Sequence, residues 1–425
     1  MSLKRKAAGA LCTLAALLLT GCTGTSLTGQ NVEELLRAPQ LSSTQNAVQS
    51  ALNRYLGETL QLKYPRGGDE MAPFLFEDFD GDGETEAAVL YTTEAGAKTA
   101  RVAILEQADG EWQVACEAEG LGAEVASVET VTVFPKGVQL AVGYANANLT
   151  EKYLTVYSYQ NGALSAAGKQ AYDEYLIADI LDEGVMQVAI VPPTTEPGAM
   201  NLQLYVGRDG ALESRQTVAL DERLMDCSGV QLSVYADRRG LVVSGSLSTG
   251  GVADELLPIQ GAWLEEGMQE SVEESTRSLS ALQAQDLSGR GTVSIPAVSA
   301  PVSTPQAAHR YYFVKWQNYL ADAYTMQFGA FDAQTGVYVR LPQTWQDKVT
   351  IADGAAEGSW RICSKNEDGS AGDTLVVLRT ADRGEDRGVY TPLAAQGSVE
   401  VLALFSSKCT DYDRALIERG ADFFQ

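Results

Sequence analysis

The sequence predicts a mainly β protein, a β-propeller of about five four-stranded blades, preceded by a helix and followed by a small α+β domain. Residues 72–336 alternate short runs rich in Val, Leu, Tyr and Thr with glycine turns. Asn-Gly and Asp-Gly dipeptides, which favour tight hairpins, recur within these runs. The turns repeat about every 50 residues, the usual length of a propeller blade.

The first 21 residues have the pattern of a cleaved signal peptide. Three basic residues at 4–6 precede the apolar run 7–19, which is too short to cross a hydrocarbon core that needs about 20 helical residues. Residues 19–22 read Leu-Thr-Gly-Cys and resemble the lipobox of bacterial lipoproteins. The resemblance implies that Cys22 is acylated and anchors the chain to the lipid bilayer, on the extracytoplasmic face of the cell membrane. The alternative is an ordinary signal peptide with an incidental cysteine.

Two short segments separate the predicted anchor from the strands. Residues 22–31 are small and polar and are expected to form a flexible tether. Residues 32–71 are expected to be an N-terminal helical segment, because Val48, Leu52 and Tyr55 follow helical spacing and Ser42 or Ser43 can cap the helix.

Two series of glycines define the predicted blades over residues 72–336. The first series precedes one strand of each unit and comprises Gly83, Gly137, Gly184, Gly240 and Gly291. The second series lies in hairpin turns and comprises Gly110, Gly162, Gly210 and Gly267. Four strands per unit favour propeller blades. A β-sandwich pair or a solenoid built from the same hairpins is the alternative.

The first unit contains an acidic loop, residues 78–86, that predicts a metal site. Carboxylates stand at positions 1, 3, 5 and 9 of the loop, and glycine at position 6 permits a sharp turn. Oxygen ligands at this spacing are typical of Ca²⁺ sites. The loop is not an EF-hand, because position 12 is Val89 and no helix follows. The predicted metal residues are Asp78, Asp80, Asp82, Glu84 (through its carbonyl) and Glu86. An acidic surface turn without metal is the alternative.

This loop resembles the DxDGDGxxE motif of FG-GAP/VCBS repeats, which occur in integrin-type β-propellers and in bacterial surface lipoproteins. The resemblance covers roughly residues 72–336, but the motif is complete only in the first unit. It implies a structural calcium ion in the first blade. In the fifth unit the loop reads DLSGRG, and we hypothesise that Arg290 pairs with Asp286 and replaces the cation; an exposed turn with solvated charges is the alternative.

Residues 337–425 break the blade pattern and predict a C-terminal α+β domain. Three strands, at 359–364, 374–379 and 398–405, precede a helical pattern at 412–424. A Pro342-x-x-Trp345 turn after a strand gives this segment a weak similarity to PsbP/Mog1-like domains. We expect Pro342 and Trp345 to form a turn and its core side chain. Cys363 and Cys409 are either buried thiols or a pair.

Composition and missing motifs limit the function. The formal net charge is −25, which disfavours binding to nucleic acid. The single histidine, His309, stands alone, and no Walker A, GxGxxG or GxSxG motif is present. We therefore expect a non-catalytic binding or scaffold protein whose ligand is a protein or polysaccharide of the cell envelope. The alternatives are an envelope enzyme with a glycosidase-like carboxylate pair, which needs two facing carboxylates, and an accessory or sensor subunit of a membrane complex.

Overall fold

The computed structural model describes residues 41–93, 99–196, 198–247, 251–265, 277–279, 282–299, 310–356 and 358–424. It divides into two compact units, residues 1–50 and residues 51–425. The predicted signal, Cys22, the tether and His309 lie outside the described residues. No helix in the described ranges is both long and apolar enough to cross a membrane.

The N-terminal helix forms where the apolar spacing places it. Helix α3 spans Ser43–Leu56, and Ser42 caps it by a reciprocal pair of hydrogen bonds. The Gln45 backbone N–H donates to Ser42 Oγ (3.2 Å), and the Ser42 N–H donates to Gln45 Oε1 (2.9 Å). Val48 and Leu52 are fully buried. The predicted helical segment is confirmed over this range.

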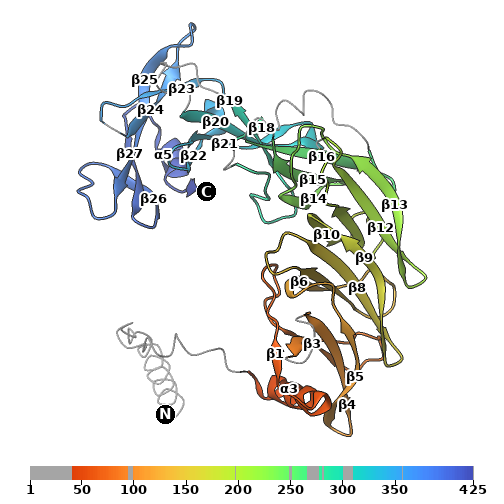
Figure 1. The fold of residues 1–425 in the computed structure, drawn as a ribbon. Coiled ribbons are helices and arrows are strands. Elements are labelled where there is room, and N and C mark those ends of the chain that lie inside the picture. Colours follow the sequence, from red (N-terminus) through yellow and green to blue (C-terminus); the bar gives the residue numbers. More distant parts are fainter. Residues whose placement is uncertain are drawn as a thin grey trace, which may run out of the picture. The chain divides into compact units, whose positions relative to one another are not determined.

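The strands form antiparallel sheets, six among the described residues, that follow one another in chain order (Figure 1). The first sheet contains β1 Leu60–Leu62, β2 Phe74–Glu77, β3 Glu86–Thr93, β4 Arg101–Ala108 and β5 Glu111–Glu119. The second contains β6 Glu124–Val131, β7 Gln139–Ala145, β8 Lys152–Gln160 and β9 Ala163–Ala171. The third contains β10 Glu174–Ala178, β11 Gln187–Val191, β12 Asn201–Arg208 and β13 Ala211–Ala219.

The remaining sheets have five strands each. The fourth contains β14 Gly229–Tyr235, β15 Arg238–Ser246, β16 Val252–Gln260, β17 Trp263–Leu264 and β18 Arg277–Ser278. The fifth contains β19 Ile295–Ser299, β20 Tyr311–Asn318, β21 Tyr324–Asp332, β22 Val337–Leu341 and β28 Ala421–Phe423. The sixth contains β23 Val349–Asp353, β24 Ser359–Lys365, β25 Ala371–Asp382, β26 Thr391–Gln396 and β27 Val399–Phe405. Two 3₁₀ turns, η1 Tyr319–Ala321 and η2 Gln343–Trp345, and helix α5 Asp411–Ile417 complete the described elements.

Several of the hydrophobic cores in the described residues lie between two consecutive sheets. One core joins the first and second sheets, through residues such as Leu90 and Val142. The next joins the second and third sheets, and a further core joins the third and fourth, through residues such as Leu202 and Leu257. Repeated four-stranded meanders that pack in series are propeller-like, and the predicted mainly β class is confirmed.

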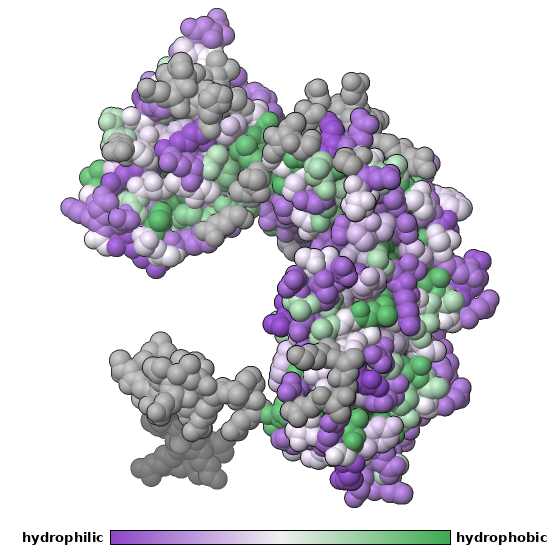
Figure 2. Space-filling view, viewed as in Figure 1, coloured by the Kyte–Doolittle hydropathy of each residue, from purple (hydrophilic) through white to green (hydrophobic). Residues whose placement is uncertain are grey.

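The visible surface is largely hydrophilic, as expected for a strongly acidic chain. Figure 2 shows hydrophilic residues over much of the visible face, interrupted by smaller groups of hydrophobic ones. Isolated exposed aromatics such as Trp263 and Tyr324 are normal for soluble surfaces.

The hairpin turns agree with the second glycine series in three sheets. Gly110, Gly162 and Gly210 have positive φ, and so does the Asp or Asn before each, as type I′ turns require. Gly267 lies outside the described residues, and the equivalent turn of the fourth sheet is at Gly261 instead. The prediction that Gly240 precedes a strand is wrong: Gly240 lies inside β15, and Ala236 with φ of 53° makes the turn before that strand.

The predicted boundary between residues 336 and 337 cuts a hairpin. Strand β22 pairs with β21 from Phe328↔Leu341 to Asp332↔Val337, so the fifth sheet continues into the segment assigned to the C-terminal domain. The terminal helix is also shorter than predicted: α5 ends at Ile417, and after Gly420 the chain returns as β28 to pair with β22. Glycine is a poor helix former, which favours this exit.

The Pro342–Trp345 turn behaves as expected. Residues 343–345 form the turn η2, and Trp345 is buried in the core between the fifth and sixth sheets. The four described cysteines are free thiols, so Cys363 and Cys409 do not pair.

Candidate functional site

The acidic loop connects two strands of the first sheet. Strands β2 and β3 pair down to Glu77↔Glu86, and residues 78–85 form the connection. Phe79, at the start of the loop, is buried in the core between the first two sheets. The loop is therefore attached at both ends to rigid structure, and its tip carries the acidic side chains.

Asp78 organises the backbone of this loop. Its Oδ1 accepts hydrogen bonds from the backbone N–H groups of Gly81 (2.7 Å) and Asp82 (3.0 Å), and its Oδ2 accepts from Gly83 (3.0 Å). Gly81 and Gly83 have φ of 73° and 96°, a region that side chains other than glycine rarely adopt. The glycines of the motif thus permit the turn that Asp78 stabilises.

Three of the predicted metal residues come together. Carboxylate oxygens of Asp78, Asp80 and Glu86 lie within 4.8 Å of one another and can hold a metal ion. The carboxylates of Asp82 and Glu84 are not members of this group, and the predicted contribution of the Glu84 carbonyl stays a prediction; Asp82 Oδ1 accepts a hydrogen bond from the Glu84 backbone N–H (2.8 Å). Carboxylate oxygens are the ligands that hard divalent cations prefer.

Glu86 differs from its partners because it is buried. Its exposed fraction is 4%, and its Oε2 accepts a hydrogen bond from the Phe79 backbone N–H (2.8 Å). The pKa of Glu86 is raised to about 6, chiefly by burial and also by the negative charges of Asp80, Asp82 and Asp78, while the hydrogen bond from Phe79 acts in the opposite direction. An ionised Glu86 is therefore costly unless a cation is present.

The same turn recurs in other sheets without the cluster. Asp179 and Asp286 start equivalent loops, and each accepts a hydrogen bond at Oδ2 from the N–H five residues later, of Gly184 (3.1 Å) and Gly291 (2.6 Å). Asp78 makes the same bond to Gly83. One aspartate and one glycine are therefore enough to form the turn, so the turn does not account for Asp80 and Glu86.

The position of Glu86 is filled by an amide in the second and third sheets. Gln139 and Gln187 are fully buried at this position. Gln139 Oε1 accepts from the Val133 backbone N–H (2.8 Å), and Gln187 Oε1 accepts from Leu181 (2.9 Å), as Glu86 accepts from Phe79. A neutral side chain thus performs the structural role, and the charge of Glu86 is specific to the first sheet.

The hypothesised Arg290–Asp286 pair is absent from the described structure. Backbone N–H groups of Ser288 and Gly291 and the Ser288 hydroxyl donate to Asp286. These hydrogen bonds lower the pKa of the mostly exposed Asp286, although its slight burial opposes them. Backbone donors, rather than a guanidinium, satisfy this carboxylate.

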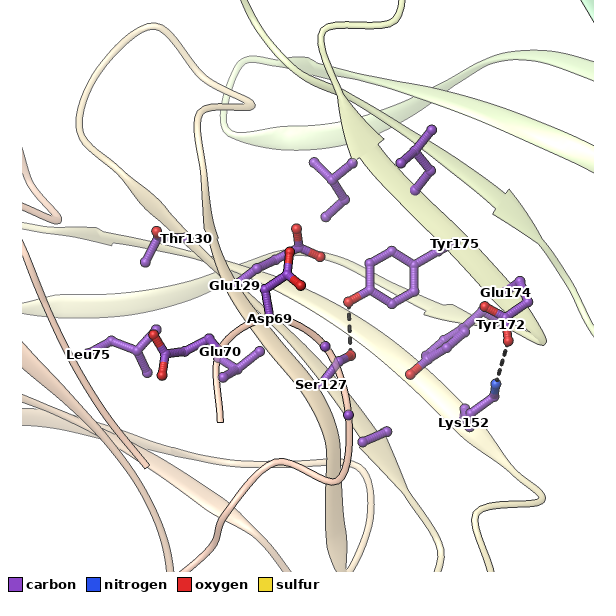
Figure 3. Close-up of a pocket in the computed structure, with 16 residues that line it drawn as sticks. Asp69, Glu70, Leu75, Ser127, Glu129, Thr130, Lys152, Tyr172, Glu174 and Tyr175 are labelled. Atoms are coloured by element: carbon purple, nitrogen blue, oxygen red, sulfur yellow. Dashed lines mark hydrogen bonds and ion pairs between the residues drawn. The ribbon is translucent and has the colours of Figure 1, made fainter. Parts of the chain in front are cut away.

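A second candidate site is a pocket of about 640 Å³ lined by residues 67–70, strand β6 and strand β10 (Figure 3). Residues 66–70 lie along the edge of β6, because the N–H groups of Arg66 and Gly67 donate to the carbonyls of Val125 (3.0 Å) and Ala126 (2.9 Å). Lys63 and Arg66 both form ion pairs with Glu124. These contacts hold Asp69 and Glu70 over the pocket.

The floor of the pocket combines tyrosines and carboxylates. The Tyr175 hydroxyl lies 2.8 Å from Ser127 Oγ, and the rings of Tyr172 and Tyr175 meet edge to face with centroids 5.0 Å apart. Burial raises the pKa of Glu129; the Tyr175 hydroxyl opposes this and the Asp69 charge adds to it. Figure 3 shows Glu129 and Asp69 beside each other near Tyr175.

Sequence patterns did not reveal this pocket. Asp69, Glu129 and Tyr175 come from three segments separated by dozens of residues, and none stands in a recognisable motif. Only the pairing of the 66–70 segment with β6 brings them together.

Comparison with known proteins identifies no family for this chain. No protein-family model and no curated protein matches the chain. Among solved structures, a protein described as a candidate 6-phosphogluconolactonase from Bacteroides uniformis is 13% identical with a TM-score of 0.29, covering 74% of this chain and 94% of its own. A rhamnogalacturonan lyase from Bacillus licheniformis is 11% identical with a TM-score of 0.34, covering 83% of this chain and 72% of its own. Neither likeness is close enough to carry an argument about function.

Proposed function

We propose that this chain is a lipid-anchored extracytoplasmic protein of the cell envelope that binds a ligand without catalysis and whose first sheet is stabilised by calcium. The observation that carries the calcium proposal is the contrast between Glu86 and its equivalents Gln139 and Gln187. All three accept the same kind of backbone hydrogen bond, but only Glu86 adds a buried negative charge, beside Asp78 and Asp80.

A bound cation offsets the cost of this charge. Three clustered carboxylates repel one another, and burial of one of them disfavours its ionised form. A divalent cation at the cluster converts the repulsion into attraction. Calcium suits the site better than magnesium, because it accepts irregular arrangements of oxygen ligands, whereas magnesium demands near-octahedral geometry. The FG-GAP/VCBS-like motif supports the same ion.

Thermal unfolding in excess EGTA and in millimolar calcium tests this proposal. We expect calcium to raise the melting temperature of the wild type but not of an Asp80→Ala/Asp82→Ala variant. Magnesium at the same concentration is the control for general ionic effects. Equal melting temperatures with and without calcium would leave the loop an acidic turn.

The lipid anchor rests on Cys22 and the sequence before it. Incorporation of radiolabelled palmitate into the chain tests it. We expect labelling of the wild type and none of a Cys22→Ala variant, with the protein recovered in the membrane fraction only in the first case. Palmitate labelling that persists in the variant would contradict the anchor.

A second candidate function is a glycosidase-like enzyme. The observation in its favour is the proximity of Glu129, whose pKa is raised by burial, to Asp69 in the pocket. Glycosidases need one protonated and one ionised carboxyl group facing each other. Release of reducing ends from envelope polysaccharides, lost in Glu129→Gln, would support this reading over the non-catalytic one.

A further inference from the structure

We propose that the pocket between residues 67–70, β6 and β10 binds the primary ammonium group of a small organic molecule. This inference rests on the proposed binding function and names the class of its ligand. It is independent of the calcium loop, which connects β2 and β3 and contributes no residue to the lining of the pocket. The supporting observations are the charge of the pocket, its tyrosine rings and its size.

The pocket carries uncompensated negative charge. Asp69, Glu70 and Glu129 face it, and no Lys or Arg of the described chain forms an ion pair with any of them. Glu70 uses one oxygen to accept from the Ala72 backbone N–H (2.8 Å). The only lysine of the lining, Lys152, is paired with a different lining carboxylate, that of Glu174 (3.4 Å). A cation would therefore enter the pocket favourably.

Lys152 itself illustrates how the pocket accommodates an ammonium group. Its Nζ lies 5.0 Å from the centroid of the Tyr172 ring, pairs with Glu174 and donates to the Asp173 carbonyl. Cation–π attraction and charge-assisted hydrogen bonds act together there. Tyr175, with Glu129 and Asp69 beside it, repeats this combination of a ring and carboxylates without a lysine (Figure 3). We therefore expect the ammonium group of a ligand to bind beside Tyr175, Glu129 and Asp69, where no lysine is present.

The size and the walls favour an organic cation over a metal ion. A cavity of about 640 Å³ falls in the range of small-molecule pockets, about 300–1,000 Å³. Leu75, Leu176 and Ile177 contribute apolar surface to its lining, against which methylene groups can pack. A calcium ion would instead need six to eight oxygen ligands at short range.

The binding groups are held in place before a ligand arrives. Gly143 leaves room for the Tyr172 hydroxyl, because a Cβ at this position would lie 2.5 Å from it. Ser127 holds the Tyr175 hydroxyl, and the 66–70 segment is fixed on β6. Pre-ordered groups lose little entropy on binding, which favours measurable affinity for a small ligand.

The test uses cadaverine, a linear diamine, titrated calorimetrically into the full chain in detergent with EGTA present. The uncharged pentanediol of the same length is the matched ligand control. We expect cadaverine to bind and the diol not to. Glu129→Gln and Asp69→Asn should each weaken binding about 10- to 100-fold, the effect of losing one hydrogen bond to a charged group. Glu222→Gln changes an exposed acidic residue that is not part of the lining and should leave the affinity unchanged.

Three results would overturn the inference. They are equal binding of the diol and the diamine, no binding of cadaverine by a folded wild type, and unchanged affinity in both Glu129→Gln and Asp69→Asn. A calcium titration of the Glu86→Gln variant, whose loop cluster is disabled, separates the two sites. If the Glu86→Gln variant binds calcium, loses this binding when Glu129→Gln is added, and does not bind cadaverine, the pocket is a metal site instead. Loss of the calcium effect at the loop alone would contradict the proposed calcium site and leave this inference intact.

Discussion

Replacing Glu86 with glutamine separates the structural role of this residue from its role in metal binding. Gln139 and Gln187 already perform the structural role at the equivalent positions, so the hydrogen bond from Phe79 should survive the change. The substitution removes a buried charge from a cluster that also contains Asp78 and Asp80. Its effect on stability should therefore change sign between metal-free and calcium-loaded protein.

The pKa of Glu86 gives the size of the first effect, and the usual affinity of extracellular calcium sites gives the size of the second. Without metal, the pKa of Glu86 is raised from 4.5 to about 6, so the folded state resists ionisation and loses stability as pH rises through this interval. At pH 7 the cost is about 1–2 kcal/mol, and Glu86→Gln should recover it. With about 5 mM calcium and a dissociation constant of about 10⁻⁴–10⁻³ M, binding should stabilise the wild type by about 1–2 kcal/mol.

Urea unfolding at pH 7, in EGTA and in calcium, measures these differences. In EGTA the variant should be more stable than the wild type, and in calcium the order should disappear or reverse because only the wild type responds. Gln139→Ala is the control for loss of the backbone hydrogen bond and should destabilise the protein equally in both conditions. A Glu86→Gln variant that is less stable in EGTA, or that keeps the full calcium response, would refute the reasoning.

Three further predictions concern buried groups. Burial raises the pKa of Asp254 from 3.8 to about 6, so this carboxylate opposes folding as pH rises from 4 to 7. Over this range the free energy of unfolding of Asp254→Asn, measured in urea, should rise by about 2 kcal/mol relative to that of the wild type. Stabilities of the two proteins that change in parallel with pH would contradict this prediction. Gly143→Ala would place a Cβ 2.5 Å from the Tyr172 hydroxyl. It should lower the free energy of unfolding by about 1–3 kcal/mol and weaken cadaverine binding. An unchanged affinity in calorimetry would show that Gly143 does not affect the pocket. Arg310 donates two hydrogen bonds, of 2.8 and 2.7 Å, to the fully buried Asp332. Arg310→Ala should lower the free energy of unfolding by about 2–4 kcal/mol. Arg310→Lys should be more stable than Arg310→Ala but less stable than the wild type, because lysine cannot donate the two parallel hydrogen bonds of a guanidinium.

Local chemistry made part of this molecule predictable. The hairpins at Gly110, Gly162 and Gly210 form where predicted, because Asp-Gly and Asn-Gly tolerate the positive φ of the turn irrespective of their surroundings. The DxDGDG loop folds around Asp78 for the same reason, since its hydrogen bonds reach only three to five residues along the chain. Short runs rich in Val, Leu, Tyr and Thr and the turn signals between them thus predicted the mainly β class.

The wrong predictions concern residues whose conformation depends on the pairing of strands in a sheet. Gly240 resembled the other turn glycines, yet it lies within β15 because the fourth sheet turns earlier, at Ala236. The C-terminal residues matched a helical pattern, but β22 offered an unpaired edge that β28 fills, and backbone hydrogen bonds to an existing sheet outweigh a weak helical preference.

The candidate sites divide in the same way. The sequence by itself determined the acidic loop, because its ligands are nearly contiguous, but only the tertiary structure shows that Glu86 is buried and that the carboxylate of Asp82 lies outside the cluster. The pocket was decided only by tertiary structure. Asp69, Glu129 and Tyr175 meet because one loop lies along the edge of β6, and such an alignment is set by contacts between segments that no local pattern in the sequence records.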